Sequence, residues 1–291
     1  MGFVALFMVA LMPVLKTLLL TAVGLVLAVD RINLLGPTAR HNLNNMVFYV
    51  FSPCLMGAYL AKTVTFDVMI NMWFMPVNIL ITFVIGSALG WILVKITKAP
   101  INLQGLVIGC CAAGNLGNLL LIVIPAICNE PDNPFGEYSV CMGDGAAYVS
   151  VSMAVGAIYI WSYVYVIMKI SAEKSNRVER LDTHHSVVTI RGATVPCVTL
   201  IVGANLLRGL RRSGMSALLI IGIIVVRYIA LPLIGIVVVR GAHHFGWVGS
   251  NPLYQFVLML QFALPPAMSI GTISQLFEAG EGECSVVMLW T

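Results

Sequence analysis

The chain has 291 residues, of which 59% are hydrophobic and only 10% are charged, and its mean hydropathy is +0.96. Soluble globular domains carry charge on about a quarter of their residues, so this composition excludes that class. The apolar residues form continuous runs, whereas the strands of a membrane β-barrel alternate apolar and polar residues. The sequence therefore predicts an all-α polytopic membrane protein. The net charge of +4 lies in short links between the runs and gives no indication of a nucleic-acid partner.

Apolar runs of membrane-spanning length recur along the chain, since a helix of roughly 20 apolar residues crosses a bilayer. The polar links are brief apart from a basic loop at 171–191, which separates two membrane regions, 1–170 and 192–291. The spans expected from these runs are 5–29, 43–61, 68–94, 101–128, 141–168, 193–207, 216–239 and 253–277, followed by a short apolar run at 284–290.

The basic residues in the links predict the orientation, because short cytoplasmic loops are enriched in lysine and arginine. The links after the first, third and fifth spans are basic. The second carries Lys62 alone, and the fourth carries three acidic residues and no basic one. This alternation predicts a non-cytoplasmic N-terminus, which is the lumenal side in an organelle membrane, and a cytoplasmic loop at 171–191.

Two of the runs contain helix-breaking residues near their centres. The first has Gly-Asn-Leu-Gly-Asn at 114–118, and the second has Leu-Pro-Pro at 264–266. A break at this depth frees backbone N–H and C=O groups that hydrocarbon cannot satisfy, so it survives only inside protein or beside a wet cavity. Broken helices in corresponding positions of two halves indicate the substrate site of a transporter.

The two halves also echo each other in sequence. Pro53-Cys54 recurs as Pro196-Cys197, and the pattern Glu-x-Ser-Val-x-Met occurs at 137–142 and again at 283–288. An odd number of spans in each copy inverts the second copy relative to the first. We therefore predict inverted five-helix repeats with crossed broken helices.

The second repeat is incomplete. No apolar run precedes 193–207 to correspond to the first span, so the sixth helix is missing, and the run 284–290 is a truncated tenth. Without the missing crossing, a cluster of three arginines falls on the non-cytoplasmic side, against the positive-inside rule. The cluster consists of Arg208, Arg211 and Arg212.

The remaining residues form no recognisable catalytic or metal-binding motif. The seven cysteines lie mostly within or at the ends of apolar runs, without the spacing of a zinc site, and are interpreted as small packing residues. No catalytic Ser/His/Asp set, phosphate-binding loop or metal cluster stands out. We therefore expect neither an enzyme nor a bound metal or cofactor.

Several long blocks resemble a known family, the plant PIN-LIKES proteins of the auxin efflux carrier group. The resemblance covers nearly the whole chain. The blocks are MPVLKTLLLT at 12–21, GCCAAGNLGNLLLIVIP at 109–125, VTLIVGANLLRGL at 198–210, IIVVRYIALP at 223–232 and YQFVLMLQFALPPAMSIGTI at 254–273.

The resemblance implies a ten-helix carrier of two inverted repeats in the endoplasmic reticulum membrane, with the fourth and ninth helices crossing at mid-membrane. It also implies transport of indole-3-acetic acid (auxin) between cytosol and lumen, which limits the auxin that reaches nuclear signalling. The missing sixth helix and the truncated tenth depart from that pattern. The alternative is therefore a truncated, non-transporting isoform or a regulatory membrane-embedded partner of full-length carriers. Association into a homo-oligomer is a further expectation.

The implied substrate carries a carboxylate, and the N-terminus of a half-helix suits an anion. The asparagine of the crossing motif lies at the substrate site in the family, and Asn115 is the matching position; capping of the broken helix alone is the alternative role. The expected substrate-binding residues are Gly114, Asn115, Gly117, Asn118, Gln261, Pro265, Pro266 and Ser269.

Three charged residues lie within the apolar runs, where charge is costly and usually faces a cavity or a partner. Arg227 is well inside its run, Lys16 is about midway along the first run, and Asp144 is only one turn into its own. We interpret the three as candidates for a counter-ion or gating role.

Overall fold

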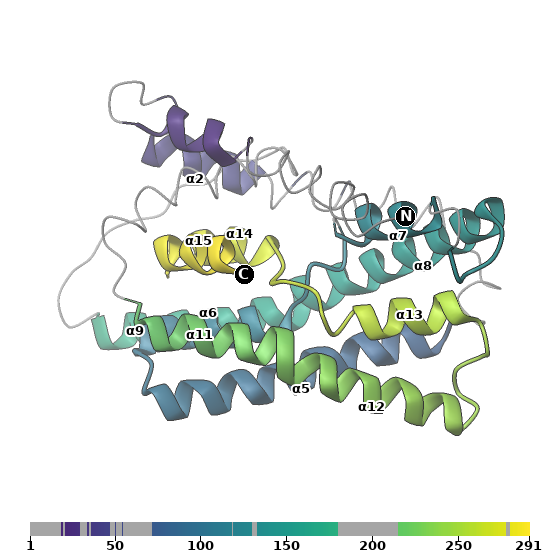
Figure 1. Cartoon of the computed structure of the whole chain (residues 1–291). Coiled ribbons are helices and arrows are strands. Elements are labelled where there is room, and N and C mark those ends of the chain that lie inside the picture. Colours follow the sequence, from purple (N-terminus) through teal and green to yellow (C-terminus); the bar gives the residue numbers. More distant parts are fainter. Residues whose placement is uncertain are drawn as a thin grey trace.

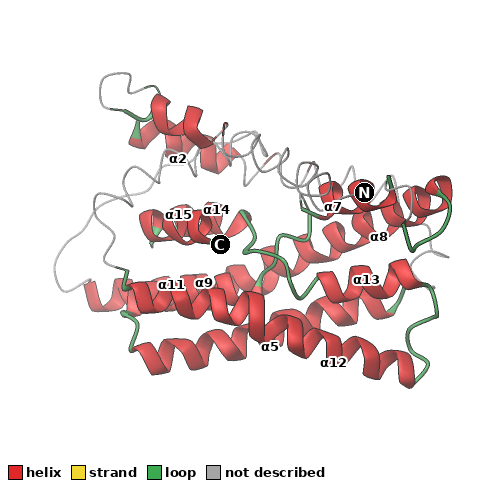
Figure 2. Ribbon diagram, in the orientation of Figure 1, coloured by secondary structure: helices red, strands yellow, loops and turns green. Residues whose placement is uncertain are grey.

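Helices make up every regular element of the described chain (Figure 2). The computed structural model describes residues 72–117, 119–129, 133–179, 215–277 and 280–291, together with 21–29, 36–46 and positions 19, 34, 50 and 54. In this part of the chain, three helices are long and apolar enough to cross a membrane: Phe74–Thr97, Tyr138–Lys174 and Ala217–His244. The predicted all-α membrane class is confirmed.

Two π-helical turns interrupt the longest helices (Figure 1). In chain order they are α2 (Pro37–Met46), α5 (Phe74–Thr97), α6 (Ile101–Ala112), α7 (Leu120–Cys128), α8 (Tyr138–Tyr159), η2 (Ile160–Val164), α9 (Tyr165–Glu179), α11 (Ala217–Val225), η3 (Val226–Ala230), α12 (Leu231–His244), α13 (Pro252–Leu260), α14 (Ser269–Leu276) and α15 (Glu281–Trp290).

Most predicted spans that fall on described residues correspond to helices. α5 matches the expected 68–94, the continuous α8–η2–α9 matches 141–168, and α11–η3–α12 matches 216–239. α2 begins before the predicted 43, since Pro37 suits the first turn of a helix and the polar residues that follow do not prevent one. The predicted span 193–207, most of 43–61 and Lys16 lie outside the described residues.

The two runs with central breaks are each divided into two short helices. α6 and α7 replace the run 101–128, and α13 and α14 replace 253–277. None of these four helices alone reaches the roughly 20 residues needed to cross a bilayer. The two connecting loops cross near the centre of the bundle, with α6 and α14 on one side and α7 and α13 on the other (Figures 1 and 2). The predicted crossing of broken helices is confirmed.

A close approach between α5 and α6 fixes the first broken helix. A Cβ atom at Gly86 would lie 2.4 Å from the carbonyl oxygen of Cys111, and one at Gly90 would lie 3.0 Å from the Cβ of Cys111. Only glycine permits this separation, so the small-residue face of α5 sets the position of the last turn of α6. That turn leads directly into the crossing.

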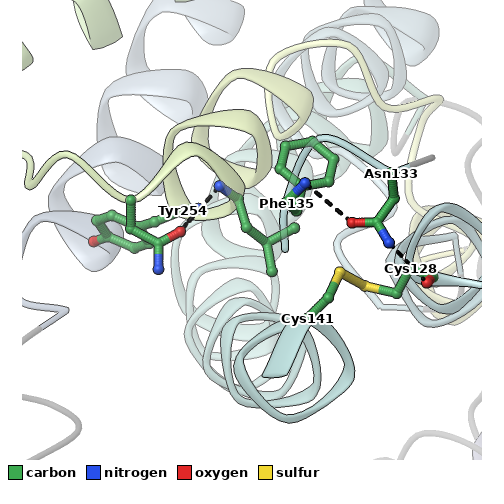
Figure 3. Close-up of a disulfide and its surroundings, with 7 residues drawn as sticks. Cys128, Asn133, Phe135, Cys141 and Tyr254 are labelled. Carbon is green, nitrogen blue, oxygen red and sulfur yellow. Dashed lines mark hydrogen bonds between the residues drawn. A yellow bond between two sulfur atoms is a disulfide. The ribbon is translucent and has the colours of Figure 1, made fainter. Parts of the chain in front are cut away.

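A disulfide between Cys128 and Cys141 joins the end of α7 to the start of α8 (Figure 3). The Asn133 side chain orders the connection, because it donates to the Cys128 carbonyl at 3.3 Å and accepts from the backbone N–H of Phe135 at 3.0 Å. The interpretation of all cysteines as packing residues is therefore wrong for this pair. Spacing alone did not reveal it, because nothing in the sequence showed that the chain folds back between the two residues.

The disulfide predicts a specific loss of stability. Cys141→Ser is expected to lower the free energy of unfolding by about 2–4 kcal/mol, because the unfolded chain regains the freedom that the cross-link removes. The readout is the apparent melting temperature of the purified protein in detergent, without reductant. Cys54→Ser is the control, since Cys54 is exposed and unbridged. Equal melting temperatures for the two variants would contradict the bridge.

Candidate functional site

The two crossing loops pair through their backbones. The N–H of Asn115 donates to the carbonyl of Pro265 at 2.8 Å, and the N–H of Ala267 donates to the carbonyl of Ala113 at 2.9 Å. These bonds form an isolated antiparallel bridge between Gly114 and Pro266. Each break thus supplies hydrogen-bond partners for backbone groups that the other break exposes. Such pairing is required inside a bilayer, because hydrocarbon cannot form hydrogen bonds with these groups.

Arg227 reaches this crossover from the third long helix. Its side chain is 0% exposed. It donates from Nη1 to the carbonyl of Cys111 and from Nη2 to the carbonyl of Pro265, each at 3.1 Å. One guanidinium therefore bridges the last turn of α6 and the segment that follows α13. Both are C-terminal ends of half-helices, where the helix dipole favours a cation.

The guanidinium has no acidic counter-ion among the described residues, and its Nε has no hydrogen-bond partner there. Arg227 lies in the π-helical turn η3, and η3 directly precedes α12, which begins with Leu231 and Pro232. A π-turn inside an α-helix is frequent at functional sites. The crossover consequently holds a buried positive charge that only backbone carbonyls of the described chain neutralise.

The other two half-helices begin at the crossover. α7 starts at Leu120 and α14 starts at Ser269, and their N-cap residues, Leu119 and Met268, have no side-chain oxygen to cap the first turn. Helix N-termini carry partial positive charge and bind anions. Two positive dipole ends and one guanidinium therefore gather around the same pair of loops.

The residues predicted from the glycine–asparagine motif lie at this point. Asn115 is half-buried, and none of the described residues forms a hydrogen bond with its side chain. Gly114 is buried, and a Cβ there would meet Arg227 Nη2 at 2.8 Å and the Leu264 Cβ at 3.2 Å. A Cβ at Gly117 would meet the Met153 Cε at 3.3 Å. Asn118 lies outside the described residues.

The proline motif is divided between two roles. The carbonyl of Pro265 accepts both from Asn115 and from Arg227, and Pro266 forms the bridge with Gly114. Ser269 is half-buried and begins α14. The structure therefore brings these three residues to the crossover with Gly114 and Asn115.

Gln261 takes part in a different set of contacts. Its side chain is 0% exposed, donates to Ser152 Oγ at 2.9 Å and accepts from Asn78 Nδ2 at 2.8 Å. Asn78 also donates to the carbonyl of Leu258 at 3.0 Å. Gln261 thus ties α13 to α5 and α8, and both ends of its amide are bonded to protein. Asn78 was not among the predicted site residues, although an amide inside the apolar run 68–94 was a usable signal.

The intramembrane charges have different positions. Arg227 is at the crossover, as described. Asp144 is half-buried in the second turn of α8, one turn after the disulfide-bonded Cys141, and therefore lies near the end of its helix. This position at the helix end is that of a residue at the membrane interface and does not favour a role beside Arg227.

Membrane-spanning helices around two crossed broken helices are the architecture of a membrane carrier. The comparisons agree, because the chain matches the membrane transport protein family over residues 9–191 and 183–291. It is 43% identical to PIN-LIKES 1 of Arabidopsis thaliana over 98% of this chain and 76% of that protein. It is 43% identical to PIN-LIKES 3 of the same plant over 98% and 93%, and 38% identical to PIN-LIKES 7 over 100% and 95%. No solved structure matches the chain.

The chain therefore belongs to the PIN-LIKES proteins of the membrane transport protein family. The resemblance seen in the sequence blocks is confirmed. The alignments with PIN-LIKES 1, 3 and 7 extend over 359, 364 and 375 positions, more than the 291 residues of this chain, so these relatives contain residues without a counterpart here. The two family matches meet at 183–191, within the basic loop.

The contact between Gly114 and Arg227 gives a testable prediction. Gly114→Ala is expected to lower the free energy of unfolding by about 1–3 kcal/mol, because the added methyl group displaces the guanidinium from its two carbonyls. Thermal unfolding in detergent measures the change. Gly143→Ala on α8 is the control, since a Cβ there meets nothing within 4 Å. A Gly114 variant as stable as the Gly143 variant would show that Arg227 does not occupy this position.

Proposed function

We propose that this chain carries auxin, as the indole-3-acetate anion, across the endoplasmic reticulum membrane and so regulates the auxin available for nuclear signalling. The observation that carries the proposal is the convergence of Asn115, Arg227 and two helix N-termini on one buried crossover. Every one of these groups offers a hydrogen-bond donor or positive charge. Such a set selects a small anion.

The carboxylate is held at the crossover in this proposal. The Asn115 amide faces it as a donor, and the Arg227 guanidinium supplies the balancing charge while it stays bonded to the Cys111 and Pro265 carbonyls. Hydrogen bonds to charged groups contribute about 1.5–3 kcal/mol. The indole lies against apolar neighbours of the crossover such as Leu264 and Met153, whose thioether suits an aromatic ring.

Transport follows by alternating access around this fixed site. In carriers built on broken helices, one part of the bundle rocks against the other and opens the site to each side in turn. The inverted five-helix repeats proposed here, with residues 1–170 and 192–291 on either side of the loop 171–191, supply the two parts.

The disulfide supports the proposed orientation and compartment. Disulfides persist in oxidising compartments such as the lumen of the endoplasmic reticulum and are rare on the cytosolic side. The Cys128–Cys141 bridge lies at the acidic link between α7 and α8, which the positive-inside rule also places outside the cytosol. The two independent arguments agree on a lumenal link and a cytoplasmic loop at 171–191.

A second candidate function is that of a non-transporting partner of longer relatives. The observation that favours it is the excess length of the aligned relatives, which matches the proposal that a sixth helix is missing after the loop 171–191. Expression of this chain alone and together with a full-length PIN-LIKES protein discriminates the two. A carrier takes up auxin alone, whereas a regulatory partner changes only the uptake by its relative.

Uptake of labelled indole-3-acetate into vesicles containing this chain tests the carrier proposal. Asn115→Ala is expected to reduce the initial uptake rate at least tenfold, because one charge-assisted hydrogen bond to the carboxylate is lost. Asn102→Ala is the matched control, because Asn102 lies on the same broken helix but is exposed in its first turn.

Two results would contradict the proposal. Equal rates for the two variants would remove Asn115 from the site. No uptake by the unmodified chain, together with a changed rate of uptake by a co-expressed full-length relative, would favour the non-transporting partner.

A further inference from the structure

A concavity lies away from the crossover, where the end of α5, the start of α6 and the end of α9 meet. It has a volume of about 460 Å³. Its polar lining consists of Lys95 and Lys98 from the end of α5, Gln104 from α6 and Lys174 from α9, with the indole of Trp91 beside them. Neither the family match nor the transport proposal gives this pocket a role.

The three ammonium groups have no acidic partner among the described residues. Lys95 lies 5.5 Å from the centre of the Trp91 ring, a cation–π contact that leaves its charge uncompensated. Lys95 and Lys98 also face the C-terminal end of the α5 dipole, which explains two of the lysines without a ligand. Lys174 is not explained in this way, because it comes from a helix 76 positions further along the chain than Lys98.

The first turn of α6 adds a second source of positive potential. α6 is twelve residues long and begins at Ile101, two positions after the pocket residue Ala99, and its N-cap Pro100 offers no capping side chain. The N-terminus of a helix is an anion-binding feature. The concavity is therefore lined by three lysines and the N-terminus of α6. Positive groups of this kind are suited to binding a phosphate.

An apolar face leads from the lipid region to this pocket. Leu80, Val84 and Trp91 are 41%, 49% and 55% exposed, and their spacing of four and seven residues puts them on one side of α5. Lys98 is the C-cap residue of α5 and lines the pocket together with Trp91. An acyl chain packed along this face would place its headgroup among the lysines, with Trp91 at the headgroup level typical of interfacial tryptophans.

We propose that the pocket binds the phosphomonoester headgroup of an anionic phospholipid, with an acyl chain along the exposed face of α5. Basic pockets between membrane-spanning helices on the cytoplasmic side bind such headgroups, and the positive-inside rule places Lys95, Lys98 and Lys174 on that side. The inference rests on the membrane class of the protein and is independent of the substrate proposed for the crossover.

The experiment uses the purified full chain in nanodiscs of phosphatidylcholine with and without a small fraction of phosphatidylinositol 4-phosphate. Native mass spectrometry counts the bound phosphoinositide. The double variant Lys98→Gln/Lys174→Gln is expected to weaken its retention tenfold or more, because each lysine near an anionic headgroup contributes comparably to binding. Glutamine keeps most of the side-chain length, and both residues are exposed, so the fold is retained.

The matched control is Lys169→Gln, which removes an exposed lysine of the same helix, α9, that does not line the pocket. Retention equal to that of the unmodified chain is expected. A third arm adds 10 mM inorganic phosphate or a soluble inositol phosphate. Bound lipid that resists this addition supports the headgroup assignment.

Three results would overturn the proposal. One is equal retention by the double variant and the Lys169 control, which would mean that the pocket is not the site. Another is displacement by free phosphate, which would identify a soluble anion as the occupant. The third is equal retention of phosphatidylcholine and phosphoinositide, which would show that the headgroup charge is not recognised.

Discussion

The structure depends on one constraint, that backbone groups freed by a broken helix have no water to bind inside a membrane. The chain meets it by placing two breaks against each other. Asn115 and Ala267 donate across the crossing, and Arg227 donates to the carbonyl of Cys111 and to that of Pro265, which also accepts from Asn115. Most other features serve this arrangement, including the glycines of α5 that let α6 approach and the polar contacts that fix α13.

The arrangement also determines the chemical character of the candidate site. The carbonyl of Pro265 accepts from two donors, whereas the groups that remain around the crossing are an asparagine amide, helix N-termini and the guanidinium. The site is consequently rich in donors and positive charge. This preference for anions follows from the way the two broken helices satisfy their backbone groups, and it does not depend on the identity of the substrate.

Much of this architecture was predictable from the sequence, because its signals are local. Continuous apolar runs indicated the spans, and Gly-Asn and Pro-Pro motifs at mid-depth indicated the breaks, since glycine and proline act on their own backbone. The Cys128–Cys141 bridge and the contacts of Gln261 were not predictable in this way. They depend on which side chains face each other across helices, and residues 109 positions apart such as Ser152 and Gln261 carry no shared local pattern.

The position of the guanidinium has a consequence for the energy source of transport. In carriers with broken helices, the unwound carbonyls and half-helix C-termini commonly coordinate Na⁺ or H⁺. Here a permanently charged side chain of the protein itself stands at the carbonyls of Cys111 and Pro265. A sodium ion there would meet a fixed like charge. In the proposed carrier, an entering anion would meet a cation that the chain itself supplies at the crossover, so charge balance at the site would not require a bound sodium ion.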